Sequence, residues 1–442
     1  MNALTQRLTT AVAQADLARR HGRLTAFNGL VIEASGPEAH LGELCEVLPA
    51  HGAPVQAEVV GFRDNRVLLM PYGNVQGVCA DSLIRATGRS LSIPVGQGLL
   101  GRVVDAFSQP LDDGPAISYD AHYPLYREPI NPLDRAEIDE VLETGVRAID
   151  GLLTLGVGQR VGVFAGSGVG KSTLLGMLAK HVSADVTVMA LIGERGREVG
   201  DFLAHSLGTE GLRRSVVMVA TADQPALVRT HAVHAAHAVA EYFRDQGKSV
   251  LLILDSMTRF AMAQREIGLA VGEPPTFRGY TPSVFGLLPK VLERCGRMRR
   301  GGSISAVYSV LVEGDDMNEP VTDHMRAILD GHVVLQRDLA ARGHHPAIDV
   351  LQSASRLMGR VVPTAELAVA SEVKRLLAVY ESSRDLVDLG AHQRGANPAL
   401  DRAVDLKPAL DEVLQQSASD HTDRTETMAR LRSALDSKGG AS

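Results

Sequence analysis

The 442-residue sequence predicts an α/β protein in which a mostly parallel sheet lies between a small N-terminal β-barrel and a C-terminal helical domain. Three observations support this prediction. Short apolar or alternating runs, broken by Gly, Pro, Asn and Asp, fill residues 24–95 and are typical of a small barrel. Strand-like apolar runs then alternate with helical stretches, which indicates a parallel sheet. After residue 363 the strand-like runs end and helical patterns continue.

The N-terminal part contains the predicted barrel and its flanks. Its strand-like runs read LTAFNGLVIEA, GELCEVLP, VQAEVVGF, RVLLMPYG and LSIPVG. Before them, apolar side chains recur near helical spacing at Leu4, Leu8, Val12 and Leu17, so this segment is either a docked or frayed terminal helix or a helix that binds a partner. Residues 105–135 form a connector, because no helical or strand pattern continues for long among their prolines and acidic residues.

The central and C-terminal parts complete the predicted organisation. We expect strands at residues 159–165, 185–193, 215–221, 249–254, 304–312 and 332–336. The runs SEVKRLLAVYESSRDLVDLG and PALDEVLQQ are helical and precede a polar tail. The predicted domains are therefore 1–94 with the terminal helix and barrel, 95–363 with the parallel sheet, and 364–442 with the C-terminal helices.

Composition excludes several classes of protein. The chain is 45% hydrophobic and 22% charged, and no segment approaches the roughly 20 apolar residues of a membrane span. Polar residues interrupt the N-terminus, so we expect a cytoplasmic protein without a secretory signal. Three widely spaced cysteines suggest neither a disulfide framework nor a zinc site. The net charge of −7 argues against a globally basic nucleic-acid binder.

A glycine-rich loop at residues 165–172, AGSGVGKS, follows a strand-like run and precedes an amphipathic helix. This context is typical of a P-loop, in which backbone N–H groups and a helix N-terminus surround phosphates. Lys171 supplies a charge for the β- and γ-phosphates, and the Ser172 hydroxyl is a ligand for Mg²⁺. The alternative is a glycine-rich turn that binds no nucleotide. The predicted nucleotide-binding residues here are Gly166, Ser167, Gly168, Val169, Gly170, Lys171, Ser172 and Thr173.

Two carboxylates follow other predicted strands of the same sheet. The run KSVLLILD ends at Asp255, as in a Walker B strand whose carboxylate holds Mg²⁺ directly or through water. The run DVTVMALIG ends just before Glu194, which is placed to orient a water molecule for attack on the γ-phosphate. The alternative for Glu194 is a surface ion pair with Arg195 or Arg197, and Glu198 is a less suitable base on the following helix.

A third pattern places His231, His234 and His237 three residues apart on an alanine-rich helix. Metal ligation needs converging ligands and a fourth donor, and the sequence suggests none. We therefore favour helix packing over a metal site for these histidines.

The residues described so far resemble the type III secretion ATPases, which are paralogues of the rotary ATP synthase alpha and beta subunits. The resemblance covers nearly the whole chain and is carried by ETGVRAIDGLLTLGVGQRVGVFAGSGVGKST, LIGERGREVGDF, SVLLILDSMTRFAMAQREIGLAVGEPP, VLVEGDDMNEPVTDH and HHPAIDVLQSASRLM. The segments AEVVGFRDNRVLLMPYG and VPTAELAVASEVKRLLAVYESSRDLVDLGAHQRG favour the flagellar export member over the injectisome member.

The resemblance implies a RecA-like P-loop ATPase core, a β-barrel that seals a ring and a helical domain that faces an export gate. It implies a homohexamer with ATP and Mg²⁺ at the subunit boundaries. Glu194 matches the catalytic glutamate, with Arg195 beside it, and Asp255 matches the Walker B residue. Arg356 matches an arginine finger that reaches a neighbour's γ-phosphate. His345 stands where relatives carry the tyrosine that stacks on adenine, which puts base selectivity in question.

The implied function is Mg-ATP hydrolysis that energises protein export through the flagellar type III apparatus. The implied partners are an export-apparatus regulator on the N-terminal helix, a central stalk protein, export chaperones and substrates, with peripheral association at the inner membrane and no nucleic acid. The segment REIGLAVGEPPTFRGY resembles a loop that lines the ring's channel.

Several alternatives stay open at this point. They are an injectisome ATPase, a rotary synthase subunit, whose loop usually reads GGAGVGKT, an RNA-translocating helicase and a non-catalytic ring subunit.

Overall fold

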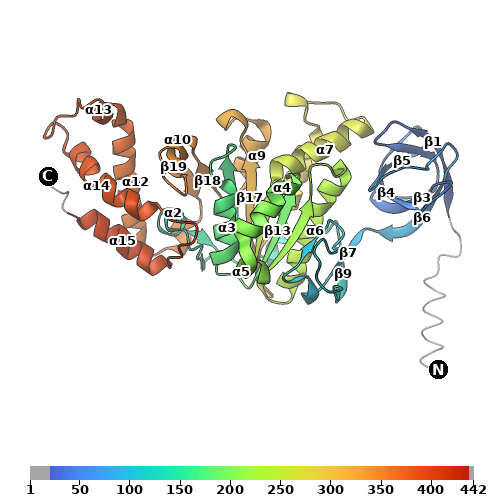
Figure 1. Ribbon diagram of the computed structural model, residues 1–442, viewed down its shortest axis with the longest axis horizontal. Helices are drawn as coiled ribbons and strands as arrows, with labels where there is room; N and C mark the ends of the chain where they lie inside the picture. Colours follow the sequence, from blue (N-terminus) through green and yellow to red (C-terminus); the bar gives the residue numbers. More distant parts are fainter. Residues whose placement is uncertain (1–19, 438–442) are drawn as a thin grey trace, which may run out of the picture.

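A closed six-stranded barrel begins the part of the chain that the computed structural model describes, residues 20–437 (Figure 1). Its strands follow the order β1-β2-β5-β4-β3-β6, and alternate side chains fill the interior. The barrel prediction is therefore confirmed, whereas the terminal helix predicted at Leu4 to Leu17 lies outside the described residues. The strands are β1 His21–Phe27, β2 Ile32–Ser35, β3 Glu43–Leu48, β4 Val55–Arg63, β5 Arg66–Pro71 and β6 Leu83–Ser90.

The central sheet has the order β19-β18-β12-β17-β15-β13-β14-β8, with β16 paired to β17. All neighbours along that order are parallel except β18 and β19. All six predicted strands are present, within one or two residues of the expected bounds, and the α/β fold class is confirmed. The strands are β8 Val103–Val104, β12 Arg160–Ala165, β13 Val186–Ile192, β14 Ser215–Ala220, β15 Ser249–Asp255, β16 Gly296–Arg297, β17 Ser303–Leu311, β18 Gly331–Leu335 and β19 Ile348–Ser355.

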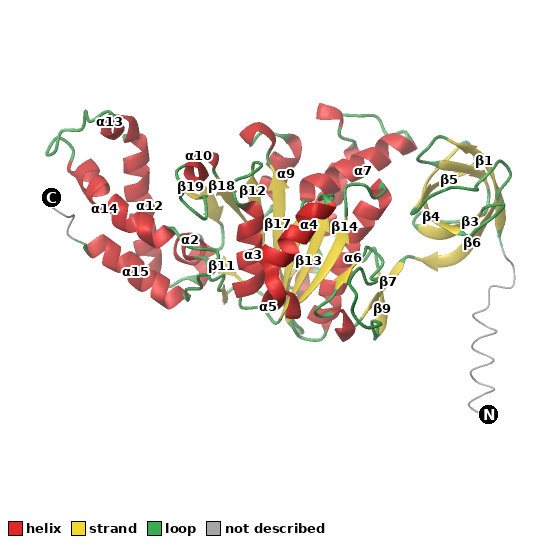
Figure 2. Ribbon diagram, in the orientation of Figure 1, coloured by secondary structure: helices red, strands yellow, loops and turns green. Residues whose placement is uncertain are grey.

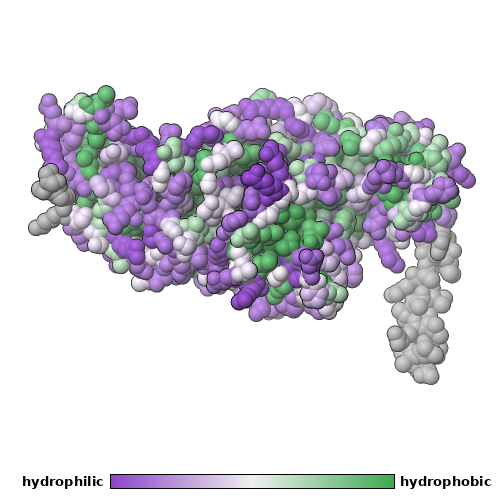
Figure 3. Space-filling view, viewed as in Figure 1, coloured by the Kyte–Doolittle hydropathy of each residue, from purple (hydrophilic) through white to green (hydrophobic). Residues whose placement is uncertain are grey.

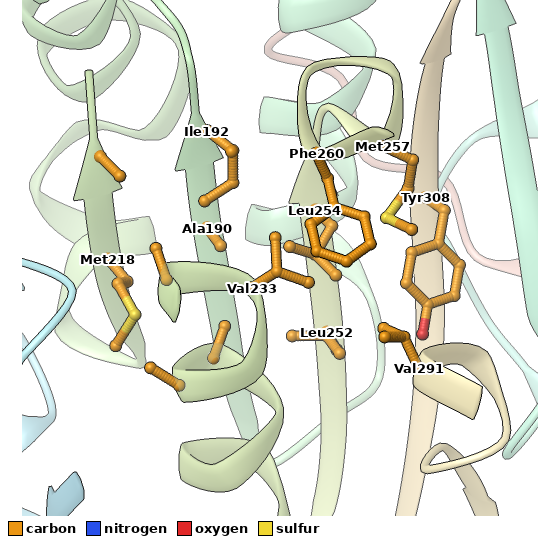
Figure 4. Packing of buried hydrophobic residues seen from close by; sticks show 14 of the residues in the cluster. Ala190, Ile192, Met218, Val233, Leu252, Leu254, Met257, Phe260, Val291 and Tyr308 are labelled. Atoms are coloured by element: carbon orange, nitrogen blue, oxygen red, sulfur yellow. The ribbon is translucent and has the colours of Figure 1, made fainter. Parts of the chain in front are cut away.

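Helices cover both faces of the sheet because successive strand residues point to opposite sides. On one face, Ala190, Leu252 and Leu254 pack with Val233 of α6 and Phe260 of α7 (Figure 4). The other face packs against α3, which carries the phosphate loop. The helices of this domain are α2 Arg147–Leu152, α3 Lys171–His181, α4 Gly196–Asp201, α5 Gly208–Arg213, α6 Ala226–Asp245, α7 Met257–Val271, α8 Pro282–Leu292, α9 Pro320–Ile328, α10 Arg337–Ala341 and α11 Met358–Val361.

Short elements complete the connections. A π-helical turn, Phe202–Leu207, joins α4 to α5, and small two-stranded sheets pair β7 with β9 and β10 with β11. These elements are β7 Ser92–Val95, β9 Ala121–Pro124, β10 Val141–Leu142, β11 Leu155–Gly156 and the 3₁₀ turns Gln97–Leu99, Pro132–Asp134, Phe277–Gly279 and Glu313–Asp315. The domain boundaries predicted after residues 94 and 363 stay predictions; the first falls inside β7.

Helices alone form the C-terminal region at the far end of the molecule from the barrel (Figure 2). They pack against α2 through Leu376, Leu410 and Leu431. Buried Arg147 of α2 donates a hydrogen bond of 2.7 Å to the Val413 carbonyl and joins this region to the sheet domain. The helices are α12 Thr364–Ser382, α13 Arg384–Asp388, α14 Pro398–Leu414 and α15 Arg424–Asp436.

The edge strand β19 is irregular near Asp349. The Asp349 carboxylate accepts hydrogen bonds from the backbone N–H groups of Leu351 at 2.9 Å and Gln352 at 3.0 Å. The register between β18 and β19 shifts in the same region. The backbone of this edge therefore departs from a regular ladder.

Buried polar groups join the barrel to the sheet domain. Glu58 of β4 accepts hydrogen bonds from Tyr72 at 2.5 Å and from Tyr126 at 3.0 Å, and burial raises the pKa of its carboxyl group. Tyr72 also contacts His231 of α6 at 3.3 Å. Burial lowers the pKa of His231 to about 3, so this imidazole is neutral at physiological pH.

Metal ligation by the α6 histidines receives no support among residues 20–437, where no group of three or more His, Cys, Asp or Glu side chains is placed to hold an ion. The three rings are buried instead, as the packing interpretation expected. No helix in the same range is long and apolar enough to cross a membrane.

Candidate active site

The phosphate loop turns from the end of β12 into the first residue of α3. Gly168 has a φ of 78° and Gly170 a φ of 93°, a left-handed backbone that favours glycine. The loop borders a pocket of about 740 Å³ that also touches the ends of β13 and β15. The pocket is lined by Gly166, Ser167, Gly168, Gly170, Lys171, Ser172, Thr173, Gly193, Glu194, Arg195, Glu198, Ala222, Ser256, Arg259 and Leu311.

The three charged groups predicted from separate segments converge here. The Lys171 ammonium donates a hydrogen bond to Oδ1 of Asp255 and lies 3.6 Å from Oε1 of Glu194. They meet because β12, β13 and β15 are parallel, so their carboxyl ends share one edge of the sheet. Burial lowers the pKa of Lys171, but the two carboxylates raise it by a larger amount. The net shift is therefore upward, and the side chain stays charged.

Glu194 has the pKa of a group that exchanges protons near neutrality. Burial raises the pKa of its carboxyl group to about 7, the neighbouring charge of Asp255 raises it too, and Lys171 opposes both. Glu198 lies close enough to accept a hydrogen bond from a protonated Glu194. A carboxyl group with such a pKa is suited to accept a proton at pH 7.

Ser309 contacts Asp255, and this contact was not predicted from the sequence. It lies on β17, beside β15, and its buried hydroxyl donates a hydrogen bond of 2.5 Å to Oδ1 of Asp255. That oxygen therefore accepts from both Lys171 and Ser309. The only sequence signal is a polar residue in an apolar strand, and the order of strands in the sheet is needed to interpret it.

Arg259 and Gly193 also went unnoticed. Arg259 lies in the first turn of α7, lines the pocket and forms no ion pair with the residues that the structure describes. Gly193 has a φ of 70°, and a Cβ atom there would lie 3.0 Å from Cβ of Arg259. The sequence could have placed Arg259 near the site, because Arg259 follows Asp255 by only four residues and lies at the start of the next helix.

The donor set suits Mg²⁺ with a nucleotide. Ser172 offers a hydroxyl oxygen in the pocket, and Asp255 offers a carboxylate directly behind Lys171. Mg²⁺ prefers such oxygen ligands and takes only one or two from a protein when substrate phosphates supply others.

Arg195 follows Glu194 and points into solvent at the start of α4, with 84% of its side chain exposed. It lines the pocket, and its one ion pair with the residues that the structure describes is with Glu198, at 3.9 Å. Figure 3 shows a strongly hydrophilic surface over this helix. Arg195 is thus available to a ligand or to a neighbouring molecule.

The structure does not bring Arg356 to the pocket of its own chain. Ser355 pairs with Gly331, the first residue of β18, so Arg356 lies at the sheet edge opposite the phosphate loop. Strand β12, which leads into the phosphate loop, has six residues, so the two edges lie about 20 Å apart. The exposed Arg356 guanidinium donates hydrogen bonds to the carbonyls of Arg326 at 3.0 Å and Ala327 at 3.4 Å.

His345 is also absent from the pocket lining. Its side chain is exposed in the loop before β19, and its carbonyl accepts a hydrogen bond of 2.8 Å from the backbone N–H of Gln416 in the C-terminal region. The stacking role predicted for His345 stays a prediction.

Comparisons with known proteins agree with this architecture. The beta-barrel domain model of the ATP synthase alpha/beta family matches residues 24–88, and the nucleotide-binding domain model of the same family matches residues 145–355. The model of the T3SS EscN ATPase C-terminal domain matches residues 362–433.

Relatives match over nearly their whole length. The flagellum-specific ATP synthase of Bacillus subtilis (strain 168) is 48% identical over 97% of this chain and 98% of its own. The type 3 secretion system ATPase of Xanthomonas euvesicatoria is 45% identical over 97% of both chains. Among solved structures, the assembled ATPase EscN of the enteropathogenic E. coli type III secretion system has a TM-score of 0.89 and 44% identity, covering 94% of this chain and 100% of that chain.

A second EscN structure, in complex with its central stalk EscO, has a TM-score of 0.86 and 44% identity over the same shares of the two chains. Sequence, fold and site geometry agree from the barrel to the C-terminal helices. The chain therefore belongs to the type III secretion ATPases, a family that includes the flagellum-specific ATP synthases and lies within the wider ATP synthase alpha/beta family.

Proposed function

We propose that this chain hydrolyses Mg-ATP to drive protein export through the flagellar type III secretion apparatus. Membership of the family supports the ATPase activity and the general export role. The single observation that carries the catalytic proposal is the convergence of Lys171, Glu194 and Asp255 beside the phosphate loop, where Lys171 and Glu194 line the pocket and Asp255 contacts Lys171 from behind.

In the proposed mechanism the backbone of residues 166–173 surrounds the phosphates and Lys171 moves from Asp255 to the β- and γ-phosphates. Ser172 and Asp255 would hold Mg²⁺, which neutralises phosphate charge when it is bound with the nucleotide. Glu194 accepts a proton from the attacking water, and its pKa of about 7 suits that task at neutral pH. Ser309 keeps the Asp255 carboxylate oriented after Lys171 leaves.

Arg356 is proposed to act on a neighbouring subunit. Its position at the opposite edge of the sheet from its own pocket supports this role, and the assembled state of EscN supports a homohexamer in which Arg356 would lie at another subunit's nucleotide. Arg195 would contact the same phosphates from the pocket rim. His345 would stack on adenine across the entrance, with less ring area than a tyrosine.

The proposed partners follow from the family. The N-terminal helix would bind an export-apparatus regulator, a central stalk protein would form a complex with this chain as EscO does with EscN, and chaperones would deliver substrates. The C-terminal region would face the export gate, which gives peripheral association with the inner membrane from the cytoplasm. No nucleic acid takes part.

The flagellar assignment is preferred over the injectisome assignment because the segments at residues 57–73 and 362–395 resemble the flagellar member, and relatives of that kind reach 50% identity. Injectisome ATPases reach 48%, so the margin is small. A complementation assay separates the two assignments. The gene should restore swimming to a flagellar ATPase deletion strain, and restoration of effector secretion alone would support the injectisome.

The decisive test of the site is Glu194→Gln in the full chain. We expect ATP to bind with parental affinity while hydrolysis falls by about a thousandfold, since the base is lost and the charged binding groups remain. Glu210→Gln is the matched control, because it removes an exposed carboxylate of α5 that does not line the pocket, and it should keep the parental activity. Parental turnover in Glu194→Gln would contradict the proposed role.

A further inference from the structure

Two strained loops stand above the sheet near the phosphate loop. Of the six non-glycine residues with positive φ among residues 20–437, the last two along the chain are Arg278, at 52°, and Asp315, at 59°. Such backbone conformations are rare for L-residues and persist only where the surroundings hold them. The loops are 37 residues apart in sequence, yet Nη2 of Arg278 donates a hydrogen bond of 2.9 Å to Oδ2 of Asp316. The two strained segments are therefore joined to each other.

The second of these loops also rests on the phosphate loop. A Cβ atom at Gly166 would lie 2.6 Å from Oδ1 of Asp315 and 3.1 Å from Nη2 of Arg337. Arg337 in turn lies 3.4 Å from Oδ2 of Asp315, and the backbone N–H of Val312 donates to the Ala165 carbonyl at 3.0 Å. The first glycine of the phosphate loop thus makes room for an ion pair, in addition to any role toward phosphate.

The first loop reaches solvent. Phe277 is 68% exposed, and the Arg278 guanidinium lies 5.8 Å from the centre of its ring. A continuous set of contacts therefore runs from an exposed aromatic side chain, through Arg278 and Asp316, to Asp315 and the backbone of the phosphate loop.

We propose that residues 312–316 couple the phosphate loop to the exposed loop at 276–280, and that Asp315 and Arg337 are positioning residues for Gly166. Each ion pair is about half exposed and contributes little to folding on its own. Instead, these ion pairs determine which conformation of the phosphate loop is populated. Since coupling is reciprocal, a contact at Phe277 changes nucleotide affinity, and nucleotide changes the loop around Phe277.

The first test measures the affinity of a fluorescent ATP analogue for the full chain. Arg337→Gln and Asp315→Asn should weaken binding about threefold to tenfold, and Arg278→Gln, which lies outside the pocket, by about twofold to fivefold. The double variant Arg278→Gln/Asp315→Asn should be clearly less than additive, because both changes break one path. Arg66→Gln is the matched control: it removes a similarly exposed arginine paired with Glu33 at 3.0 Å in the barrel, and it should bind as the parent does.

A swapped pair distinguishes positioning from folding. Arg278→Asp combined with Asp316→Arg should restore affinity to within about twofold, while either change alone should not. Circular dichroism melts identify any variant that is merely unfolded. Arg337 is 58% exposed, so Arg337→Gln reports on the same contact if Asp315→Asn destabilises its loop. Parental affinity in Arg278→Gln, or additive effects in the double variant, would overturn the proposal.

Limited trypsin cleavage after Arg278 tests the reciprocal direction. The ATP analogue should change the cleavage rate in the parent, and Asp316→Asn should abolish that change. An identical rate with and without the analogue in the parent would also overturn the coupling.

Discussion

The two edges of the central sheet differ in how complete they are. At the carboxyl ends of the parallel strands, Lys171, Glu194 and Asp255 contact one another inside a single chain and are largely buried. At the other edge Arg356 is exposed, and its guanidinium donates hydrogen bonds to the carbonyls at the end of α9. One part of the proposed catalytic machinery is therefore formed by folding alone, whereas the proposed role of Arg356 requires a second subunit. Variants at the two edges should fail in different ways.

The largest expected effect is at the preformed edge. Lys171→Ala removes the only cation in contact with Asp255 and Glu194 among the described residues, which leaves both carboxylates without an opposing charge beside the phosphate loop. We expect nucleotide affinity to fall more than a hundredfold, as measured by equilibrium binding of a fluorescent ATP analogue. Near-parental binding would show that the pocket is not the nucleotide site.

Arg356→Ala tests the other edge of the sheet. Hydrolysis should fall by about a hundredfold or more, because an arginine finger stabilises charge only in the transition state, while binding stays near parental. In mixed assemblies with Lys171→Ala chains, some pockets combine an intact Lys171 with an intact Arg356, so activity should partly return. The mixing ratio that gives maximal activity checks this, and inactivity at every ratio would contradict action on a neighbour.

Ser309→Ala sharpens the description of the preformed edge. The change removes one of two donors to Oδ1 of Asp255, so the Mg²⁺ concentration that half-saturates nucleotide binding should rise about tenfold. Ser309→Thr keeps the hydroxyl group and should stay within about threefold of the parent. Ser305→Ala is the control, since that buried hydroxyl on the same strand accepts from Gly158 instead. Unchanged Mg²⁺ dependence in Ser309→Ala would remove the positioning role.

The pH dependence of hydrolysis gives the smallest effect. The pKa of Glu194 is raised to about 7, so the ionised base is depleted below neutrality, and kcat/KM should rise with pH with a midpoint near 7. The pH dependence of folding stability has the opposite sign to that of hydrolysis. The folded state binds the extra proton between pH 4.5 and pH 7, so the contribution of Glu194 to the free energy of unfolding falls as pH rises through that window. Glu194→Gln should flatten this part of the stability profile, which chemical denaturation at several pH values measures.

The sheet and the preformed edge could be predicted from the sequence because their signals are local. The apolar runs of β12 to β18 are continuous and β-branched, and parallel strands must gather their carboxyl ends at one edge. That rule was enough to bring Lys171, Glu194 and Asp255 together. The edge strand β19 was missed, because Asp349, Gln352 and Ser353 interrupt its apolar pattern.

Contacts between neighbouring strands could not be predicted in the same way. Ser309 reaches Asp255 only because β17 lies beside β15, and strand order is a property of the whole sheet. The packing of Asp315 and Arg337 on Gly166 likewise depends on three loops that meet in space. The partner of a lone polar residue in a strand or loop cannot be predicted until the topology is known.

The carboxylate of Asp349, which occupies two N–H groups of the outermost strand, has a consequence for how copies of this chain associate. An open sheet border is a template on which further strands can add without limit, as in amyloid. Here two N–H groups of that strand are already bonded within the chain and its ladder is irregular, which disfavours the addition of a further strand. Side-chain surfaces are then the favoured route to an assembly of defined size.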